Sequence, residues 1–301
     1  MKILVNGASG FLGTNLISKA MESDDIRVLA LTTNKHTISD AGGDGRIEYY
    51  SYDELSQMDH HGIDVFINLA YPRTASGEAL GKGLKDIYES LKAISGWGIP
   101  KVINISSQSI YDPNRTCAAK ESDEAVLNDV YAEGKFLYEM IMREMFRDAE
   151  VISIRLASLI GMGFDQRVTN KLVKIALKNN HLNITEKGAV FSYMDVRDAA
   201  EALLTMCRVF LTDKELGNVY NLGGKEDYTL SEIASAVRGA IQEQTGAEIT
   251  VDTVEEAAET VPNSSLNCEA FYKDFNWQPS KSLKDSINDI LIYEKQRIDN
   301  A

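Results

Sequence analysis

The first half of the chain alternates short, nearly continuous apolar runs with longer amphipathic segments. The apolar runs are rich in β-branched residues and predict strands at residues 2–5, 27–31, 47–50, 64–69, 101–105 and 151–155. Between several of them, apolar residues recur at helical spacing and predict helices at residues 12–21, 79–95 and 125–146. Strands without polar alternation are typical of a sheet covered on both faces, and the alternation with helices favours parallel pairing. The pattern therefore predicts an α/β fold with a doubly wound parallel sheet.

The regular alternation breaks after about residue 161. Helical patterns follow at residues 169–177, 196–210, 229–244, 269–274 and 283–295, with Thr229 or Ser231 available as an N-cap. Strand patterns follow at residues 218–222 and 248–251. We expect a first domain of residues 1–161 to which segments of about 189–222 return. Residues 162–188 and 223–301 are then expected to form a smaller α/β substrate-binding lobe.

A glycine-rich turn joins the first predicted strand to the first predicted helix. Residues 6–13 read Asn-Gly-Ala-Ser-Gly-Phe-Leu-Gly, with a glycine at every third position. Gly7 permits the tight turn, Gly10 lets backbone N–H groups approach a pyrophosphate, and Gly13 lets the helix pack closely on the sheet. The helix N-terminus then favours an anion. We expect this turn to bind a dinucleotide through Gly7, Ser9, Gly10, Phe11, Leu12 and Gly13.

The end of the second predicted strand has no carboxylate to bind the adenosine ribose 2′-hydroxyl of NAD. It carries hydroxyl, amide and cationic side chains instead, at Thr32, Thr33, Asn34 and Lys35. A 2′-phosphate would find donors there without like-charge repulsion. The sequence therefore favours NADP(H) modestly over NAD(H).

Three residues suited to proton transfer follow in order. Ser107 comes at the end of the strand predicted from residue 101, where a hydroxyl points into the crevice at the carboxyl edge of an open α/β sheet. Tyr131 and Lys135 lie four residues apart in a helical pattern, so both side chains share one helix face. A nearby ammonium lowers the pKa of a tyrosine and makes it a usable general acid and base. Ser107, with Ser106 as the alternative, would hydrogen-bond the reacting oxygen.

In this order and spacing, the glycine turn, Ser107, Tyr131 and Lys135 resemble the extended branch of the short-chain dehydrogenase/reductase superfamily, the NAD-dependent epimerase/dehydratase family. Residues 106–112, 193–200, 219–223 and 275–279 are also similar to family segments, so the resemblance covers nearly the whole chain. It implies a Rossmann-type sheet and a catalytic set of Ser107, Tyr131 and Lys135. It also adds to the cofactor site Asp53, Leu69, Ala70, Tyr131 and Lys135. Finally, it implies a homodimer in which helices 79–95 and 125–146 pair into a four-helix interface.

Departures from the family pattern narrow the expected chemistry. Gln108 and Ser109 stand where a dehydratase usually has an acidic pair, so dehydration is disfavoured. Ser158 and Phe191 stand where asparagine and arginine often contact a nucleotide sugar, although a diphosphate favours charge-assisted donors. The cations that might substitute for them would be Arg167, Lys171 and Lys174.

These features predict an NAD(P)-dependent epimerase or ketoreductase that acts on a nucleotide sugar. The hydride would pass between nicotinamide and a sugar carbon while Tyr131 exchanges a proton with the oxygen on that carbon. One alternative is an NADPH-dependent reductase of a carbonyl substrate without a nucleotide, because the usual phosphate clamps are missing. Another is a non-catalytic dinucleotide-binding regulator or redox sensor.

Composition and charge narrow the possible partners. The 301 residues carry 45 acidic against 31 basic side chains, a net charge of −14, and no dense basic run, which excludes a typical nucleic-acid-binding face. The N-terminal apolar run ends at Asn6, too soon for a signal peptide, and no stretch is long enough for a membrane span. We therefore expect a cytoplasmic protein without a membrane partner. The three cysteines and four histidines lack zinc-ligand spacing, so no metal is expected.

Overall fold

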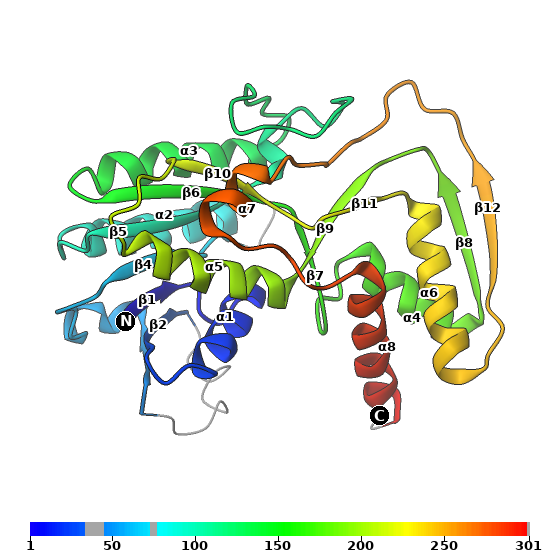
Figure 1. The fold of residues 1–301 in the computed structure, drawn as a ribbon, viewed down its shortest axis with the longest axis horizontal. Helices are drawn as coiled ribbons and strands as arrows, with labels where there is room; N and C mark the ends of the chain where they lie inside the picture. The colour runs from blue at the N-terminus through cyan, green and yellow to red at the C-terminus, as the bar shows by residue number, and fades with distance from the viewer. Residues whose placement is uncertain (34–44, 73–76, 300–301) are drawn as a thin grey trace.

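A seven-stranded sheet forms the centre of the computed structural model, which describes residues 1–33, 45–72 and 77–299 (Figure 1). Its strands are β1 Lys2–Asn6, β2 Arg27–Thr32, β3 Ile47–Ser51, β4 Val65–Asn68, β5 Lys101–Ser107, β6 Glu150–Leu156 and β10 Val219–Leu222. They lie in the order β10-β6-β5-β4-β1-β2-β3, and every pairing is parallel. The predicted doubly wound parallel sheet is confirmed, with the first six strands within two residues of their expected ends.

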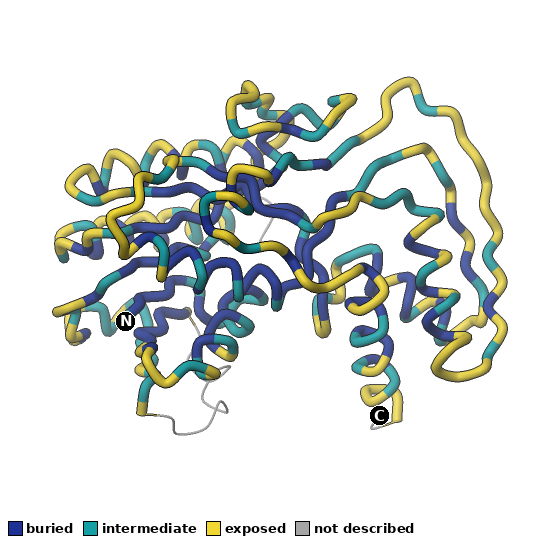
Figure 2. The backbone as a smooth tube through the Cα atoms, in the orientation of Figure 1, coloured by how far each residue is buried: buried dark blue, intermediate teal, exposed yellow. Residues whose placement is uncertain are grey.

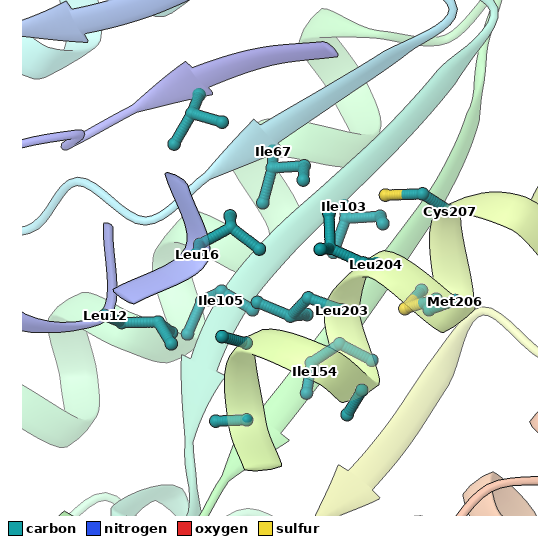
Figure 3. Packing of buried hydrophobic residues seen from close by; sticks show 14 of the residues in the cluster. Leu12, Leu16, Ile67, Ile103, Ile105, Ile154, Leu203, Leu204, Met206 and Cys207 are labelled. Carbon is teal, nitrogen blue, oxygen red and sulfur yellow. The ribbon is translucent and has the colours of Figure 1, made fainter. Parts of the chain in front are cut away.

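Helices cover both faces of this sheet (Figure 1). The helices α1 Phe11–Met21 and α5 Val196–Phe210 pack on one face, and α2 Gly77–Ser95 and α3 Val130–Met145 pack on the other. Figure 3 shows the first face, where Leu16 of α1 and Leu203 of α5 meet Ile105 of β5. Because both faces are covered, the strands carry apolar residues at successive positions, as the sequence pattern indicates.

A second apolar cluster lies beside the sheet. It is built by α4 Val168–Asn179, α6 Leu230–Thr245, α8 Leu283–Asp299 and the paired strands β8 His181–Glu186 and β12 Thr250–Glu255. The outer strand β12 is largely exposed (Figure 2). A three-stranded sheet of β7 Ser158–Ile160, β9 Phe191–Asp195 and β11 Asp227–Tyr228 and the short helix α7 Glu269–Phe275 complete the fold. The division into domains at residue 161 stays a prediction.

Several elements differ from the sequence pattern, among them α3, β8 and the strands β7, β9 and β11, which the pattern does not predict. The helix α3 begins at Val130 rather than residue 125, because the Asp129 carboxylate accepts a hydrogen bond from Ala132 N at 2.7 Å and caps the helix there. The strand β8 has alternating burial and pairs with β12, its one partner strand among the described residues, so its apolar signal is weak. Of the two predicted caps for α6, Thr229 is the one used.

No helix within the described ranges has the length and apolar character needed to cross a membrane.

Candidate active site

A cleft of about 1090 Å³ opens at the carboxyl ends of the central strands. The glycine turn after β1, the ends of β4, β5 and β6, the start of α3 and the segment before α4 all contribute to its wall. The chain leaves β1 towards β2 on one side and returns through β4 on the other, so the cleft lies at the point where the strand order reverses. This is the usual ligand position in an open α/β sheet, and the volume is large enough for a dinucleotide.

The glycine turn is held so closely that side chains are excluded from it. Gly7 has a φ of +85°, and a Cβ there would lie 2.9 Å from Ala70 N. A Cβ on Gly13 would lie 2.4 Å from the Gly7 carbonyl oxygen. Gly7 N and Ala8 N donate to the Leu31 carbonyl at 3.0 and 3.1 Å, which ties the turn to β2. The backbone of the turn is therefore fixed at the cleft wall, as a pyrophosphate site requires.

The N-terminus of α1 has the electrostatics of an anion site. Gly10 is its N-cap and supplies no side-chain acceptor, and the first turn carries no acidic residue. The first N–H groups and the positive end of the helix dipole are thus not satisfied by a local side chain. Ser9 lies beside them and accepts a hydrogen bond from Thr32 Oγ1 at 2.6 Å. These residues fit the phosphates of a dinucleotide.

The two sides of the cleft meet at a pair of stacked rings. Phe11, in the glycine turn, stacks on Phe164, in the segment before α4, with ring centroids 4.4 Å apart and planes at 11°. Phe164 was not anticipated from the sequence, because nothing in its local pattern marks a ring that packs on residue 11.

Some of the other expected cofactor residues line the cleft, and others do not. Leu69, Ala70 and Thr33 line the cleft. Asp53 is exposed in the short 3₁₀ helix Tyr52–Gln57 and does not line the cleft, whereas its neighbour Tyr52 does. Asn34 and Lys35 lie outside the described residues.

Ser107 and Tyr131 meet in the cleft. Ser107 Oγ accepts a hydrogen bond from Ser109 N at 3.1 Å and donates to Ser109 Oγ at 3.1 Å, which fixes the hydroxyl at the end of β5. The Ser107 side chain also lies near the Tyr131 hydroxyl and lowers its pKa. Ser106, the alternative, is buried, and its hydroxyl has no hydrogen-bond partner among the described residues. The contact with Tyr131 favours Ser107 as the group beside the reacting oxygen.

Lys135 lies beneath Tyr131 on α3 and is only 5% exposed. Its Nζ donates to the Ile105 carbonyl at 2.9 Å and lies 5.9 Å from the Tyr131 ring centroid. Burial lowers the pKa of Lys135 to about 8, and the charge of Glu139 acts in the opposite direction. The ammonium thus has a fixed place within reach of the tyrosine.

The pKa of Tyr131 is raised in this structure, although a lowered value is the expectation from its pairing with Lys135. The residue is 44% exposed at the cleft, and its partial removal from water by the surrounding protein raises the pKa. The neighbouring Ser107 hydroxyl and the charge of Arg167 lower it, without outweighing burial. The Lys135 ammonium, 5.9 Å from the Tyr131 ring centroid, does not outweigh burial either.

Of the three candidate phosphate cations, Arg167 alone lines the cleft. Its Nε donates to the Leu159 carbonyl at 3.2 Å, its guanidinium lies 5.2 Å from the Phe164 ring centroid, and burial lowers its pKa. Lys174 pairs with Asp165 at 2.7 Å, and Lys171 is exposed away from the cleft. Ser158 lines the cleft but Phe191 does not. Arg167 is therefore the cation placed to meet an anionic substrate group.

The chain is similar to known proteins along most of its length. The family model described as "NAD dependent epimerase/dehydratase family" matches residues 3–223. UDP-glucuronic acid decarboxylase 6 of Arabidopsis thaliana is 22% identical over 308 aligned positions, which cover 95% of this chain and 87% of that protein.

Solved structures share the fold. The UDP-glucuronic acid 4-epimerase from Bacillus cereus, in complex with UDP-glucuronic acid and NAD, superposes with a TM-score of 0.80 at 20% identity, over 99% of this chain and 100% of that one. The UDP-glucose 4-epimerase from Thermotoga maritima, with UDP-glucose, superposes with a TM-score of 0.79 at 19% identity, over 99% and 100% of the two chains.

Proposed function

The chain belongs to the NAD dependent epimerase/dehydratase family, and from this premise we propose that it epimerises or reduces a nucleotide-linked sugar by hydride transfer. The observation that carries the proposal is the convergence of Ser107, Tyr131 and Lys135 on the cleft that the glycine turn also lines. A non-catalytic dinucleotide-binding regulator would have no need of this set.

The proton relay follows from the contacts of these side chains. A bound nicotinamide cofactor would give the hydride to the sugar carbon in a reduction, and would take it from that carbon and return it in an epimerisation. Tyr131, whose raised pKa keeps it protonated at neutral pH, donates its proton to the sugar oxygen when a carbonyl is reduced and accepts one when an alcohol is oxidised. Ser107 holds that oxygen through the hydroxyl fixed by Ser109, and Lys135 stabilises the phenolate that Tyr131 becomes.

Gln108 and Ser109 support epimerisation or reduction over dehydration. Both line the cleft beside Ser107, and neither is an acid. Removal of water would need a further acid and base there. Ser109 is already bonded to Ser107, and Gln108 Oε1 accepts from Arg115 Nη2 at 3.3 Å, so both act as neutral hydrogen-bonding groups.

The cofactor of this reaction is a nicotinamide dinucleotide. The preference for NADP rests on the sequence of the second strand end, of which Thr33 lines the cleft. The family description and the Bacillus cereus structure both name NAD, so neither supports that preference. The nucleotide that copurifies with the protein decides between the two.

Two further observations support the finer parts of the proposal. Arg167 in the cleft favours an anionic substrate, such as the nucleotide sugars named with the relatives, over a neutral carbonyl compound.

Leu137 and Met140 of α3 and Tyr88 of α2 are exposed apolar side chains on the helices expected to pair in a homodimer. We include that dimer in the proposal.

The test of the proposed function is the variant Tyr131→Phe. It removes the proton donor and keeps the ring, so turnover should fall by about 100-fold or more. The assay uses NAD or NADP with UDP-glucose and UDP-glucuronic acid, followed by separation of the sugar products. Tyr293→Phe is the matched control, because Tyr293 lies on α8 and does not line the cleft. Wild-type turnover in Tyr131→Phe would overturn the proposed role of Tyr131.

A further inference from the structure

Tyr71 touches both residues of the tyrosine–lysine pair, although it lies far from them in the sequence. It follows β4 and lines the same cleft. Its ring meets the Tyr131 ring edge-on, with centroids 5.1 Å apart and planes at 81°. Lys135 Nζ lies 4.6 Å from the Tyr71 ring centroid, closer than it lies to the Tyr131 ring. One side chain thus contacts both the proposed proton donor and the ammonium below it.

The helix that carries the pair is shaped to admit this ring. Residue 134, directly before Lys135, is a glycine in the interior of α3. A Cβ at that position would lie 2.2 Å from Tyr71 Oη, 3.2 Å from Cζ and 3.4 Å from Cε2. Glycine weakens a helix, and at this position the Tyr71 side chain occupies the space that a Cβ would take, which gives the glycine a steric reason.

The tyrosine hydroxyl does not explain this arrangement. Tyr71 Oη is buried and has no hydrogen-bond partner among the described residues. A buried, unpaired hydroxyl is unfavourable, so the contacts that hold Tyr71 in place are those of its ring. On the adjacent helix, a Cβ at Gly83 of α2 would lie 3.0 Å from the Pro72 ring, so the Tyr71–Pro72 pair is wedged between glycines of two helices.

The ring also completes the surroundings of a buried cation. Within the described ranges, Lys135 has one hydrogen-bond acceptor, the Ile105 carbonyl of β5. The titratable groups that face it are Tyr131 and Glu139 from its own helix and Tyr71 from the segment after β4. Glu139 is itself paired with Arg155 of β6 at 3.1 Å. An aromatic face is favourable for an ammonium that has few other partners.

We propose that Tyr71 is a positioning residue of this active site, which holds the Lys135 ammonium and the Tyr131 ring through its aromatic face, and that Gly134 is present to admit it. The inference rests on the proposed function, because it gives Tyr71 a role through Tyr131 and Lys135. The role belongs to the ring and not to the hydroxyl, which makes the two separable by substitution.

A double-mutant cycle tests the wedge. Tyr71→Phe keeps the ring and should leave turnover within about threefold of wild type, whereas Gly134→Ala should lower it by about tenfold or more because its methyl group displaces the ring. Tyr71→Phe combined with Gly134→Ala should recover most of the loss, since the nearest remaining ring atom is Cζ at 3.2 Å. Gly81→Ala in α2 is the matched control, because a Cβ there meets nothing within 4 Å. Turnover is measured on UDP-glucose and UDP-glucuronic acid.

A second measurement reports on Lys135 without a substrate. The folded-state pKa of about 8 lies below the ordinary 10.5, so the unfolded chain binds more protons between these values, and stability rises with pH in that window. Urea unfolding gives the stability of each protein and of its Lys135→Met counterpart at each pH. The difference between the two isolates the part of the rise that comes from Lys135. Tyr71→Leu removes the aromatic face, disfavours the ammonium, and should start the rise about 0.5 to 1 pH unit lower. Tyr71→Phe should leave it in place.

The outcomes separate this inference from the proposed function. An unshifted rise in Tyr71→Leu, or no recovery in the double variant, would overturn the positioning role even where Tyr131→Phe is inactive. A shifted rise supports the positioning role even if the wild-type protein turns over neither UDP-glucose nor UDP-glucuronic acid and its sugar substrate is therefore a different one. Wild-type turnover in Tyr131→Phe counts against the proposed function alone.

Discussion

Arg167 is a half-buried cation in a protein of net charge −14. No carboxylate in the described part of the chain pairs with it; the guanidinium bonds one carbonyl and stacks on Phe164. A guanidinium carries five N–H donors in a planar fork, so most of its hydrogen-bonding capacity remains available to a ligand in the cleft. This acidic protein is proposed to bind an anionic substrate but lacks the family's usual arginine contact. Arg167 supplies a positive charge in its place.

Arg167→Met is therefore expected to weaken binding of UDP by about 10- to 100-fold, the range for loss of charge-assisted hydrogen bonds. The affinity of Arg167→Lys for UDP should lie between those of Arg167→Met and wild type, because lysine keeps the charge and loses the planar fork. Lys171→Met is the matched control, since that cation is exposed and lies away from the cleft. Isothermal titration of the holoprotein with UDP measures the effect. Equal affinity in Arg167→Met and wild type would exclude Arg167 as a phosphate contact and favour a substrate without a nucleotide.

The sequence identifies the site residues whose roles depend on local spacing. Tyr131 and Lys135 share a helix face, and Ser107 ends a strand, so their convergence follows from the topology. Tyr71 escapes prediction because its partners lie about sixty residues away along the chain and its hydroxyl forms no bond that a motif could record. The glycine inside the predicted helix at residue 134 is the one local signal of a close approach.

At the level of elements, a glycine in a helix can stabilise or destabilise the protein, depending on what occupies the space that its Cβ would take. Gly13 in the first turn of α1 faces the Gly7 carbonyl oxygen, 2.4 Å from where its Cβ would be. Gly239 in the interior of α6 faces open space within 4 Å. The first glycine is required for contact between helix and turn, and the second only weakens its helix.

Gly13→Ala is expected to lower the free energy of unfolding by about 3 kcal/mol or more, because the backbone it meets cannot move aside as a flexible side chain would. Gly239→Ala should raise the free energy of unfolding by about 0.5 to 1 kcal/mol through helix propensity. The pair is compared by urea denaturation under one set of conditions. A Gly13→Ala variant as stable as wild type would mean that the turn tolerates a side chain, against the close packing described above.

The elements that the sequence predicts well are those with strong periodicity and full burial. The strands of the central sheet and α5 have nearly the expected bounds, because both faces of the sheet and one side of the helix are covered by apolar partners. The start of α3 is set by one carboxylate cap. The strand β8 is half-buried and β12 is largely exposed, and their pairing joins residues 69 positions apart. Contacts of that range leave little local signal.

The helices α2 and α3 carry exposed apolar side chains that the packing of the described residues does not explain. Leu137 and Met140 of α3 are 56% and 39% exposed, and Tyr88 of the neighbouring α2 is 41% exposed. Positions 137 and 140 lie three residues apart and therefore on one outer face of the helix, away from its buried residues Tyr138 and Met142. Exposed apolar residues gathered on adjacent elements are typical of a protein interface.

The protein is expected to be a dimer in solution, and Leu137→Glu should make it monomeric by placing a charge in the apolar interface. Ile292→Glu on α8 is the matched control, because Ile292 is an exposed isoleucine on a helix that is not expected to pair. Sedimentation equilibrium over a range of concentrations measures both, with circular dichroism to verify that the variants remain folded. A dimer that persists in Leu137→Glu and dissociates in Ile292→Glu would place the interface on the second lobe. A wild-type monomer at every concentration would mean that the α2 and α3 surface is not a homodimer interface.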